Sequence, residues 1–326
     1  MSGDPLHPSP HDALFKRVFG ELERGGAMLR AALPAELARS IRWESLRLLP
    51  GETVGAELRG LASDLVFAAK LGDREALVYV LIEHQSTPDP RMPFRILEYV
   101  TRLWERHSQP VEGRLALPLV VPLVVYHGPR PWRVPLELGE TVALDDTLEL
   151  GELVPRLRYL LDDLSRLDAA ALRARGLPAF GTLALWALRS AFDRGFMDTA
   201  SELAGLVDEL LDADTGHEAM ASVLSYLSYI SRSGEDLVAR FRSHLSARAQ
   251  EEVMELEEML AIKKREEGRA EGRAEGRAEI LVKQLRLKFG EPSSATVQRV
   301  RDGSEADLDR WAERVLTATR LAEVFD

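Results

Sequence analysis

The sequence predicts an α/β sandwich built around a mixed sheet, and the order of its apolar segments indicates this. A helical pattern of apolar residues opens the chain at 9–22, and two short apolar runs at 61–70 and 76–85 follow it. A second helical stripe at 93–107 then precedes a long apolar run at 115–126. Helices placed before and between such strands are typical of a sheet that is covered by helices.

The first helix has a clear start. Ser9 is a favourable N-cap residue, Pro10 suits the first helical position, and Asp12 stands at the spacing of a capping box. We therefore interpret Asp12 as a capping residue rather than a metal ligand. The apolar positions after it recur at helical spacing: Leu14, Phe15, Val18, Phe19 and Leu22.

Two further strands complete the expected sheet. Gly25-Gly26 and Pro34 interrupt the helical pattern, and residues 46–49 before Pro50-Gly51 predict a first short strand. The run at 115–126 is apolar enough for a strand buried on both faces. Its two prolines indicate a sheet edge or a bulge at their positions, Pro118 and Pro122.

The two short apolar runs each carry one carboxylate at a matched depth. A hairpin centred between Asp73 and Arg74 would place Asp64 opposite Glu83, with side chains about 5 Å apart. A tighter turn at Gly72-Asp73 would make the two carboxylates diagonal neighbours, still within reach of one shared ion. Like charges inside apolar strands are costly unless a cation binds between them.

The donor set around these carboxylates fits a hard divalent cation. Gln85 follows Glu83 by two residues and so emerges on the same face, whereas the side chain of His84 points away. We expect Asp64, Glu83 and the backbone carbonyl of His84 to bind Mg²⁺, with Mn²⁺ able to substitute, and Gln85 to orient the nucleophile or the scissile phosphate. The alternative for Asp64 is a structural role beside an arginine such as Arg59.

Composition excludes several classes of protein. The chain has 326 residues, of which 45% are hydrophobic, and it contains no cysteine, so disulfides, thiolate zinc sites and cysteine nucleophiles are excluded. Together with the absence of an apolar leader or a membrane-length run, this predicts a cytoplasmic protein. The net charge of −11 argues against a generic nucleic-acid binder, but a local basic surface remains compatible with it.

Candidate phosphate contacts lie on the two expected helices of the core. Arg95, Arg102 and Arg106 share the second helix, where a DNA backbone could pass, and Lys16 lies on the first. Acidic residues interleave with the arginines, so a solvated helix with ordinary ion pairs is the alternative interpretation.

The C-terminal half is expected to be helical. From about residue 145 to 258 no polar groups gather at catalytic spacing, and residues 266–279 repeat Glu-Gly-Arg-Ala three times, which favours a semi-rigid spacer over a coiled coil. A helix at 280–289 is stopped by Gly290 and Pro292, and Ser304 with Asp307 forms a capping box before a last apolar stripe. A module this small could self-associate.

The motifs resemble a known family. The sequence is similar to the recombination-promoting nuclease (Rpn) family, also called YhgA-like transposases, within the PD-(D/E)XK nuclease superfamily. The resemblance covers roughly residues 8 to 200. The C-terminal 45 residues of the chain resemble a small helical domain of unknown function. The segments that carry it are His11-Asp12-Ala13-Leu14-Phe15-Lys16, Ser63-Asp64-Leu65, Leu81-Ile82-Glu83-His84-Gln85-Ser86, Pro93-Phe94-Arg95-Ile96-Leu97, Trp104-Glu105-Arg106-His107 and Val125-Tyr126-His127-Gly128.

This resemblance implies a restriction-endonuclease-like core and a Mg²⁺-dependent DNA endonuclease linked to recombination or mobile DNA. One departure bears on activity: the superfamily has lysine two residues after the second carboxylate, and Gln85 stands there. The rival hypothesis is therefore a catalytically weak or inactive protein that binds DNA or a partner. A third is a structural hub assembled through residues 263–326.

The expected organisation has four parts. They are a nuclease core at 8–145, a helical extension at 146–262, a spacer at 263–279 and a small helical domain at 280–326. The expected partners are DNA and, through the C-terminal helices, a second copy of the chain; no membrane is expected.

Overall fold

The computed structural model of the chain describes residues 9–49, 65–72, 74–83, 88–111, 114–143, 151–231 and 236–325. The chain divides into two compact units, residues 1–254 and residues 255–326. The predicted site residues Asp64, His84 and Gln85 lie outside the described residues.

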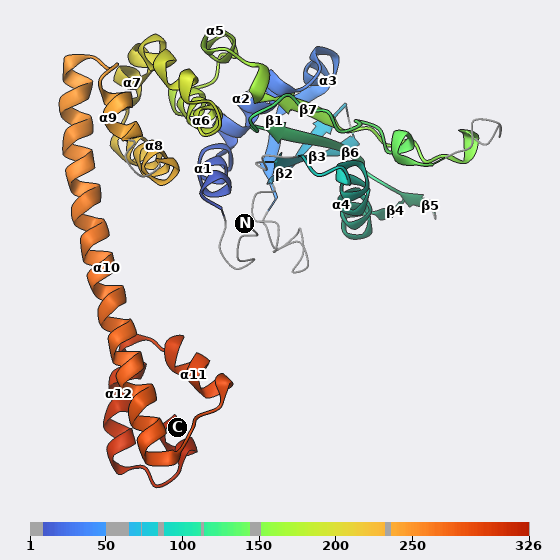
Figure 1. Cartoon of the computed structure of the whole chain (residues 1–326). Coiled ribbons are helices and arrows are strands. Elements are labelled where there is room, and N and C mark those ends of the chain that lie inside the picture. The colour runs from blue at the N-terminus through green and yellow to red at the C-terminus, as the bar shows by residue number, and fades with distance from the viewer. Residues whose placement is uncertain are drawn as a thin grey trace. The chain divides into compact units, whose positions relative to one another are not determined.

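A five-stranded mixed sheet lies at the centre of the first unit, in the order β1-β2-β3-β6-β7 (Figure 1). The pairs β1/β2 and β2/β3 are antiparallel, whereas β3/β6 and β6/β7 are parallel. The strand bounds are Ile41–Leu48 for β1, Leu65–Leu71 for β2, Arg74–Glu83 for β3, Leu119–Tyr126 for β6 and Leu160–Asp163 for β7. The predicted mixed sheet flanked by helices is present.

Helices cover both faces of this sheet. Helix α4 (Met92–His107) packs on the face that carries Val66 and Ala68 of β2 together with Val124 of β6. On the opposite face, Leu65 approaches Gly20 at the end of α1 (Pro10–Phe19), and Phe67 packs on Gly25 of α2 (Leu22–Ala32). Strand side chains alternate between the two faces of a sheet. Because helices cover both faces here, all positions from Leu65 to Ala69 are buried.

The register of the β2/β3 hairpin corrects the wider of the two turns considered above. Leu71 pairs with Arg74 and Leu65 with Val80, so only two residues connect the strands. Gly72, the first of them, has φ +59°, which lies in the left-handed region that two-residue hairpins require. The expectation of a turn centred between Asp73 and Arg74 was wrong, and the tighter alternative is the observed one.

The segment before the hairpin is more regular than its glycines predict. The pair Gly25-Gly26 lies inside α2 rather than interrupting it, because a Cβ at Gly25 would lie 2.8 Å from the ring of Phe67. Close packing against Phe67 therefore requires that Gly25 has no side chain. This requirement outweighs the low helix propensity of glycine. A short α3 (Ala35–Ser40) follows, and β1 begins earlier than the expected residues 46–49.

The long apolar run at 115–126 is divided rather than continuous. It contributes β5 (Arg114–Ala116), which pairs with β4 (Gln109–Val111), and then β6. Pro122 pairs with Tyr79 on one side, while the pairing of β6 with β7 begins only at Leu123. The proline therefore lies where the strand is locally an edge, as the sequence predicted.

The remainder of the first unit is mainly helical, but it also supplies strand β7, which the sequence interpretation missed. The helices α6 and α8 carry the most buried residues of this part. The bounds are η3 Leu138–Thr141, η4 Gly151–Leu153, η5 Leu164–Arg166, α5 Ala169–Arg173, α6 Ala179–Ser190, η6 Arg194–Leu203, α7 Ala204–Leu211, α8 Gly216–Ile230 and α9 Leu237–Arg242.

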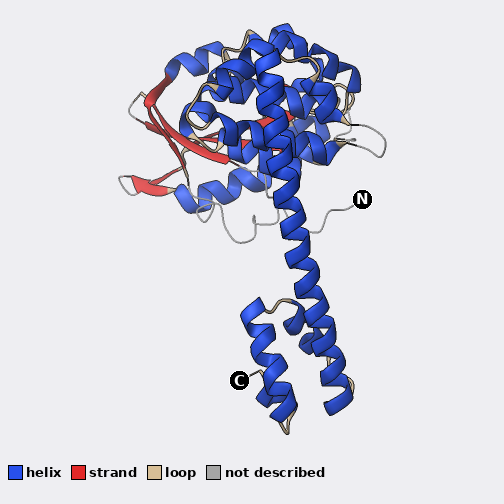
Figure 2. Cartoon of the chain, turned by 90° about the vertical axis from the view of Figure 1, so that its left-hand side faces the viewer, coloured by secondary structure: helices blue, strands red, loops and turns tan. Residues whose placement is uncertain are grey.

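The second unit has its own small apolar core. The long helix in Figure 2 is α10 (Ala247–Phe289). The Glu-Gly-Arg-Ala repeat and the helix expected at 280–289 are parts of this one continuous helix, which begins well before the expected residue 280. Its end before Gly290, which has φ +86°, is as predicted. Helices α11 (Ser294–Arg301) and α12 (Glu305–Thr317) and the turn η7 (Leu321–Val324) complete the unit. Ser304 and Asp307 form the predicted capping box. The core residues are Ala278, Leu281, Leu285, Val300, Leu308, Trp311, Val315, Ala318 and Val324.

Candidate active site

The carboxyl ends of the three parallel strands meet at one edge of the sheet. Glu83, the last residue of β3, pairs with Tyr126 of β6, and Tyr126 in turn pairs with Asp163 of β7. In open α/β sheets, ligands bind at this edge, beyond the carboxyl ends of parallel strands. At this edge Glu83 is therefore aligned with Tyr126 and Asp163 in a row across three strands. The sequence did not predict this alignment.

The rest of the predicted metal site is not tested. For Glu83 the described feature is its backbone at the end of β3, and Asp64, His84 and Gln85 lie beyond the described ranges. In the described part of the chain, no group of three or more His, Asp or Glu side chains could hold a metal ion. A magnesium site built from Asp64, Glu83 and the carbonyl of His84 thus stays a prediction.

Aromatic residues support the middle of this edge. Tyr126 is fully buried and meets Trp132 edge-on at 5.0 Å between ring centroids. The Trp132 indole donates to the hydroxyl of Tyr159 (3.2 Å), which donates to the carbonyl of Pro135 (2.8 Å). Burial raises the pKa of Tyr159, so the phenol stays protonated as a donor. A Cβ at Gly128 would lie 1.9 Å from the Tyr126 hydroxyl, which explains the glycine in that motif.

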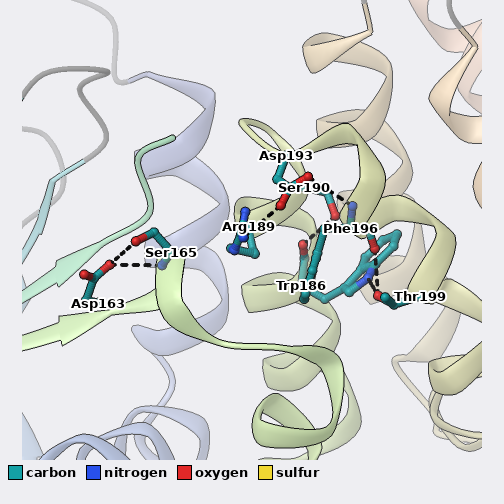
Figure 3. Close-up of polar contacts among 8 residues, drawn as sticks. All are labelled: Asp163, Ser165, Trp186, Arg189, Ser190, Asp193, Phe196 and Thr199. Carbon is teal, nitrogen blue, oxygen red and sulfur yellow. Dashed lines mark hydrogen bonds and ion pairs between the residues drawn. The ribbon is translucent and has the colours of Figure 1, made fainter. Parts of the chain in front are cut away.

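Asp163 holds the turn that follows β7 (Figure 3). Its Oδ1 accepts from the backbone N–H (3.0 Å) and the hydroxyl (2.6 Å) of Ser165. Its Oδ2 accepts from the backbone N–H of Trp132 (3.0 Å) and from Nε of Arg166 (3.1 Å). Because both oxygens are engaged, Asp163 fixes the turn and ties it to the segment after β6.

Asp162 forms a buried ion pair beside it. The carboxylate is 5% exposed and meets the guanidinium of Arg175 through two hydrogen bonds, of 2.5 and 2.8 Å. This two-point geometry is the strongest form of the pair, and its two hydrogen bonds offset part of the cost of removing both charges from water. The pair anchors the end of β7 to the segment that follows α5.

A cluster of rings lies next to the edge, on the side of α1 and α8. His127 directly follows β6 and is fully buried, with its Nδ1 3.2 Å from the carbonyl oxygen of Leu188. Its ring lies 5.1 Å from that of His11 and 5.5 Å from that of Phe192. His11 Nδ1 lies 2.7 Å from the hydroxyl of Tyr226, whose pKa burial raises. The cluster therefore joins α1, the residue after β6 and α8 through ring contacts and hydrogen bonds.

Further polar contacts in Figure 3 hold α6 against η6. The indole of Trp186 donates to the hydroxyl of Thr199 (3.1 Å), and Arg189 pairs with Asp193 (2.9 Å). Asp193 also caps the first turn of η6 through the backbone N–H of Phe196 (3.3 Å). These contacts stabilise the packing of η6 against α6, and none of them involves the strand ends described above.

The candidate phosphate contacts fall on two faces of the sheet. Lys16 is half-buried on α1, whereas the three arginines belong to α4 on the other face. Arg95 pairs with Asp89 (3.3 Å) and is 17% exposed, Arg102 is half-buried, and Arg106 is exposed. The structure thus keeps the arginines together on one helix and separates Lys16 from them.

Sequence reasoning missed the contribution of β7. The signal was present in Leu160-Leu161-Asp162-Asp163, a short apolar run that ends in two carboxylates before Ser165. Its length is too small to distinguish a strand from a helical turn without knowing what it pairs with. Along α4, Ile96 and Tyr99 are buried, whereas Leu97 and His107 are half-buried.

Comparison with known proteins adds a family and several relatives. A family model described as "Putative transposase, YhgA-like" matches residues 9–218. Recombination-promoting nuclease RpnD of Escherichia coli O157:H7 is 36% identical over 127 residues, which is 38% of this chain and 48% of that protein. RpnC of Escherichia coli K12, also named a recombination-promoting nuclease, is 33% identical over 38% of this chain and 41% of its own length.

A relative named as inactive is equally similar. The inactive recombination-promoting nuclease-like protein RpnE of Escherichia coli K12 is 37% identical over 37% of this chain and 40% of that protein. The matches thus span less than half the length of these relatives. No solved structure shows a significant match. Among the described residues, no helix is both long and apolar enough to cross a membrane.

Proposed function

Because this chain belongs to the YhgA-like transposase family, we propose that it is a metal-dependent DNA endonuclease that acts in recombination or in the movement of DNA. Relatives named as recombination-promoting nucleases support the class of reaction. The observation that carries the proposal is the position of Glu83, at the carboxyl end of β3 in the row with Tyr126 and Asp163.

The hairpin register supports one arrangement of the two carboxylates. With only two residues between Leu71 and Arg74, the sequence argument makes Asp64 a diagonal neighbour of Glu83 rather than its direct partner. Diagonal positions on adjacent strands are about 7–8 Å apart, which leaves room for one ion between two carboxylates. The position of Asp64 is part of the proposal.

The donor set suits magnesium. Asp64, Glu83 and the carbonyl of His84 are hard oxygen ligands, and Mn²⁺ accepts the same set. When bound, such a cation lowers the pKa of a coordinated water and neutralises charge on a phosphodiester. Gln85 supplies an amide that orients water or phosphate through hydrogen bonds, but it brings no positive charge to the transition state.

DNA would approach the edge along α4 in this proposal. Arg102 and Arg106 lie on the same helix as Arg95, which Asp89 already holds. Contacts of this kind position the phosphate backbone without reading sequence. Each contact also makes DNA binding weaker at higher salt.

A cleavage assay with matched variants tests the proposal. Wild-type protein is incubated with supercoiled and linear DNA in Mg²⁺, Mn²⁺ or EDTA, beside Asp64→Asn, Glu83→Gln and the exposed control Asp214→Ala. We expect metal-dependent cleavage that falls at least about a hundredfold in the first two variants, comparable with the loss of one electrostatic stabiliser, and persists in the control. Equal cleavage by wild type and Asp64→Asn would refute this site.

A second function has specific support. Gln85 replaces a lysine of the superfamily pattern, and a relative of equal similarity is named inactive. On this alternative the core binds DNA or a protein partner and cleaves nothing. DNA binding by the wild type in EDTA, without cleavage in any metal, would favour it, and Gln85→Lys would then test whether the lost charge can be restored.

A further inference from the structure

Three arginines lie around the end of β7, at the carboxyl edge of the sheet. Oδ2 of Asp163 accepts hydrogen bonds from the backbone N–H of Trp132 (3.0 Å) and from Nε of Arg166 (3.1 Å). Arg133 directly follows Trp132, and Arg130 precedes it by two residues. One carboxylate therefore holds together the two segments that carry these arginines. We call Arg130, Arg133 and Arg166 the edge arginines.

The edge arginines are exposed, and the chain compensates only part of their charge. Arg166 is 65% exposed, although Asp163 pairs with it. Arg130 and Arg133 are both exposed, and neither forms an ion pair with any residue that the structure describes. Three guanidinium groups beside one carboxylate leave two positive charges at this end of the sheet.

Other arginines of the same region are neutralised within the chain. Arg175 meets the buried carboxylate of Asp162. Arg158, which precedes β7, pairs with Glu137 (2.8 Å). The whole chain has a net charge of −11, so a positive surface at the end of β7 contrasts with the rest of the molecule. Because attraction near a surface depends on the local field, this surface favours anions although the net charge repels them.

The backbone around Arg130 has little conformational freedom. Pro129 and Pro131 flank this residue. Proline fixes its own φ, and the residue before a proline is confined to extended backbone. The hydrogen bond from Trp132 to Asp163 then anchors the segment to β7. Donors that are already held in place lose less entropy when they bind a ligand.

The edge arginines lie two strands away from the proposed metal site. Glu83, Tyr126 and Asp163 form one row across β3, β6 and β7. Neighbouring strands are about 4.8 Å apart, so the ends of β3 and β7 are about 10 Å apart. One strand of duplex DNA advances about 3.4 Å along the helix axis for each phosphate. The separation between the two sites therefore corresponds to about three nucleotides of one DNA strand.

We propose that the edge arginines bind the phosphate backbone of DNA about three nucleotides from the scissile bond, on the side of β7. The inference rests on the proposed nuclease and gives the path of the bound strand, which crosses the ends of β3, β6 and β7. Guanidinium groups bind phosphate oxygens through two parallel hydrogen bonds. Asp163 positions Arg166 for this contact. Contacts of this kind hold the strand without reading its sequence.

Equilibrium binding to duplex DNA in EDTA tests the proposal without cleavage. The full-length chain and its Arg130→Gln, Arg133→Gln double variant are titrated into a fluorescein-labelled duplex between about 50 and 200 mM KCl. Each phosphate contact contributes about 0.9 to the slope of log K against log salt, so we expect the slope to become shallower by about 1.8. The Kd at about 100 mM KCl should rise at least about tenfold. Adding Arg166→Gln should weaken binding further.

The matched control removes two exposed arginines from the other end of the strands. Arg39 and Arg42 lie at the start of β1, where β1 pairs with the end of β2. Arg39→Gln with Arg42→Gln changes the net charge by the same amount and should leave the salt slope unchanged. A conservative variant, Arg130→Lys with Arg133→Lys, keeps both charges and should retain the wild-type slope.

Equal weakening in the two glutamine double variants would overturn the proposal, because net charge alone would then explain the loss. A wild type that does not bind DNA at the lowest salt concentration would also overturn it. The cleavage assay decides the nuclease separately. Cleavage by the wild type, with normal binding after all three edge arginines are removed, would refute this binding surface alone. The expected loss of binding, without cleavage by the wild type, would support the surface and refute the nuclease.

Discussion

The sheet of the first unit and the helical core of the second differ in how far apart along the chain their contacts lie. The five strands come from positions between Ile41 and Asp163, and α4 and the β4–β5 hairpin lie between β3 and β6 along the chain. The core of the second unit uses residues between Ala278 and Val324 alone. Local signals suffice for the second arrangement, whereas the first depends on pairing between distant segments.

The same difference appears in how each unit handles charge. The first unit buries the Asp162–Arg175 pair, and Arg175 is only 13% exposed. In the second unit Asp307, in the first turn of α12, and Glu323, in η7, pair with arginines and are only half-buried. Breaking a buried ion pair is strongly destabilising, because one charge is left buried without its partner. Breaking an ion pair at the surface changes the stability little.

The largest predicted effect comes from breaking the buried pair. Arg175→Met leaves the carboxylate of Asp162 buried without its partner. We therefore expect the free energy of unfolding of the first unit to fall by about 3–5 kcal/mol. The matched control is Arg166→Met, which removes a 65% exposed arginine from Asp163 and should cost below about 1 kcal/mol. Denaturant unfolding monitored by hydrogen exchange measures the loss of stability in each variant. It also shows which part of the first unit loses protection. Similar losses in the two variants would contradict the contrast between the buried and exposed pairs.

Two glycine substitutions are predicted to have opposite signs. At Gly25 a Cβ would lie 2.5 Å from the carbonyl oxygen of Phe19 and 2.8 Å from the ring of Phe67, so Gly25→Ala should destabilise the first unit by about 1–3 kcal/mol. At Gly272 no atom lies within 4 Å, so Gly272→Ala should stabilise α10 by up to about 1 kcal/mol. Thermal unfolding combined with circular dichroism tests both. A gain of stability in Gly25→Ala would show that the packing of α2 on β2 is looser than described.

These residues also show how far the sequence determines the fold. The caps at Ser9 and Ser304 and the end of α10 before Gly290 were predicted, because each depends on groups within a few residues. Gly25 was misinterpreted because its role depends on Phe67, which is distant along the chain. A propensity scale measures the glycine in isolation and cannot include that contact.

The same reasoning applies to the candidate site. The sequence predicted that Glu83 lies near the end of an apolar strand, but it left two hairpin registers open, and only the pairing of Leu71 with Arg74 distinguishes them. The contribution of Asp163 could not be predicted, because β7 is four residues long and is recognised as a strand only by its pairing with β6. Spacing therefore located one half of the edge, and topology supplied the other.

The smallest effect concerns acid stability, and it separates the two units most finely. A hydrogen bond from Arg320, together with backbone N–H groups of Thr319 and Arg320, lowers the pKa of Glu323 from 4.5 to about 2. The Ser304 hydroxyl similarly lowers the pKa of Asp307. Since these folded-state pKa values lie below those of the unfolded chain, the stabilisation is complete above about pH 4.5 and is lost as the pH falls towards 2.

We therefore expect α12 and η7 to loosen as the pH falls from about 4.5 towards 2, before the buried core of the first unit does. The ¹⁹F resonance of 5-fluorotryptophan at Trp311, assigned by its loss in Trp311→Phe, reports on α12 because this indole is part of the core of the second unit. In Asp307→Asn combined with Glu323→Gln, the carboxylates that titrate are absent, so the acid-dependent change should become smaller while neutral-pH stability falls. An unchanged acid profile in that double variant would mean that groups outside these caps control the response. The second unit would then owe less of its stability to local capping, and more to its apolar core, than its short-range contacts indicate.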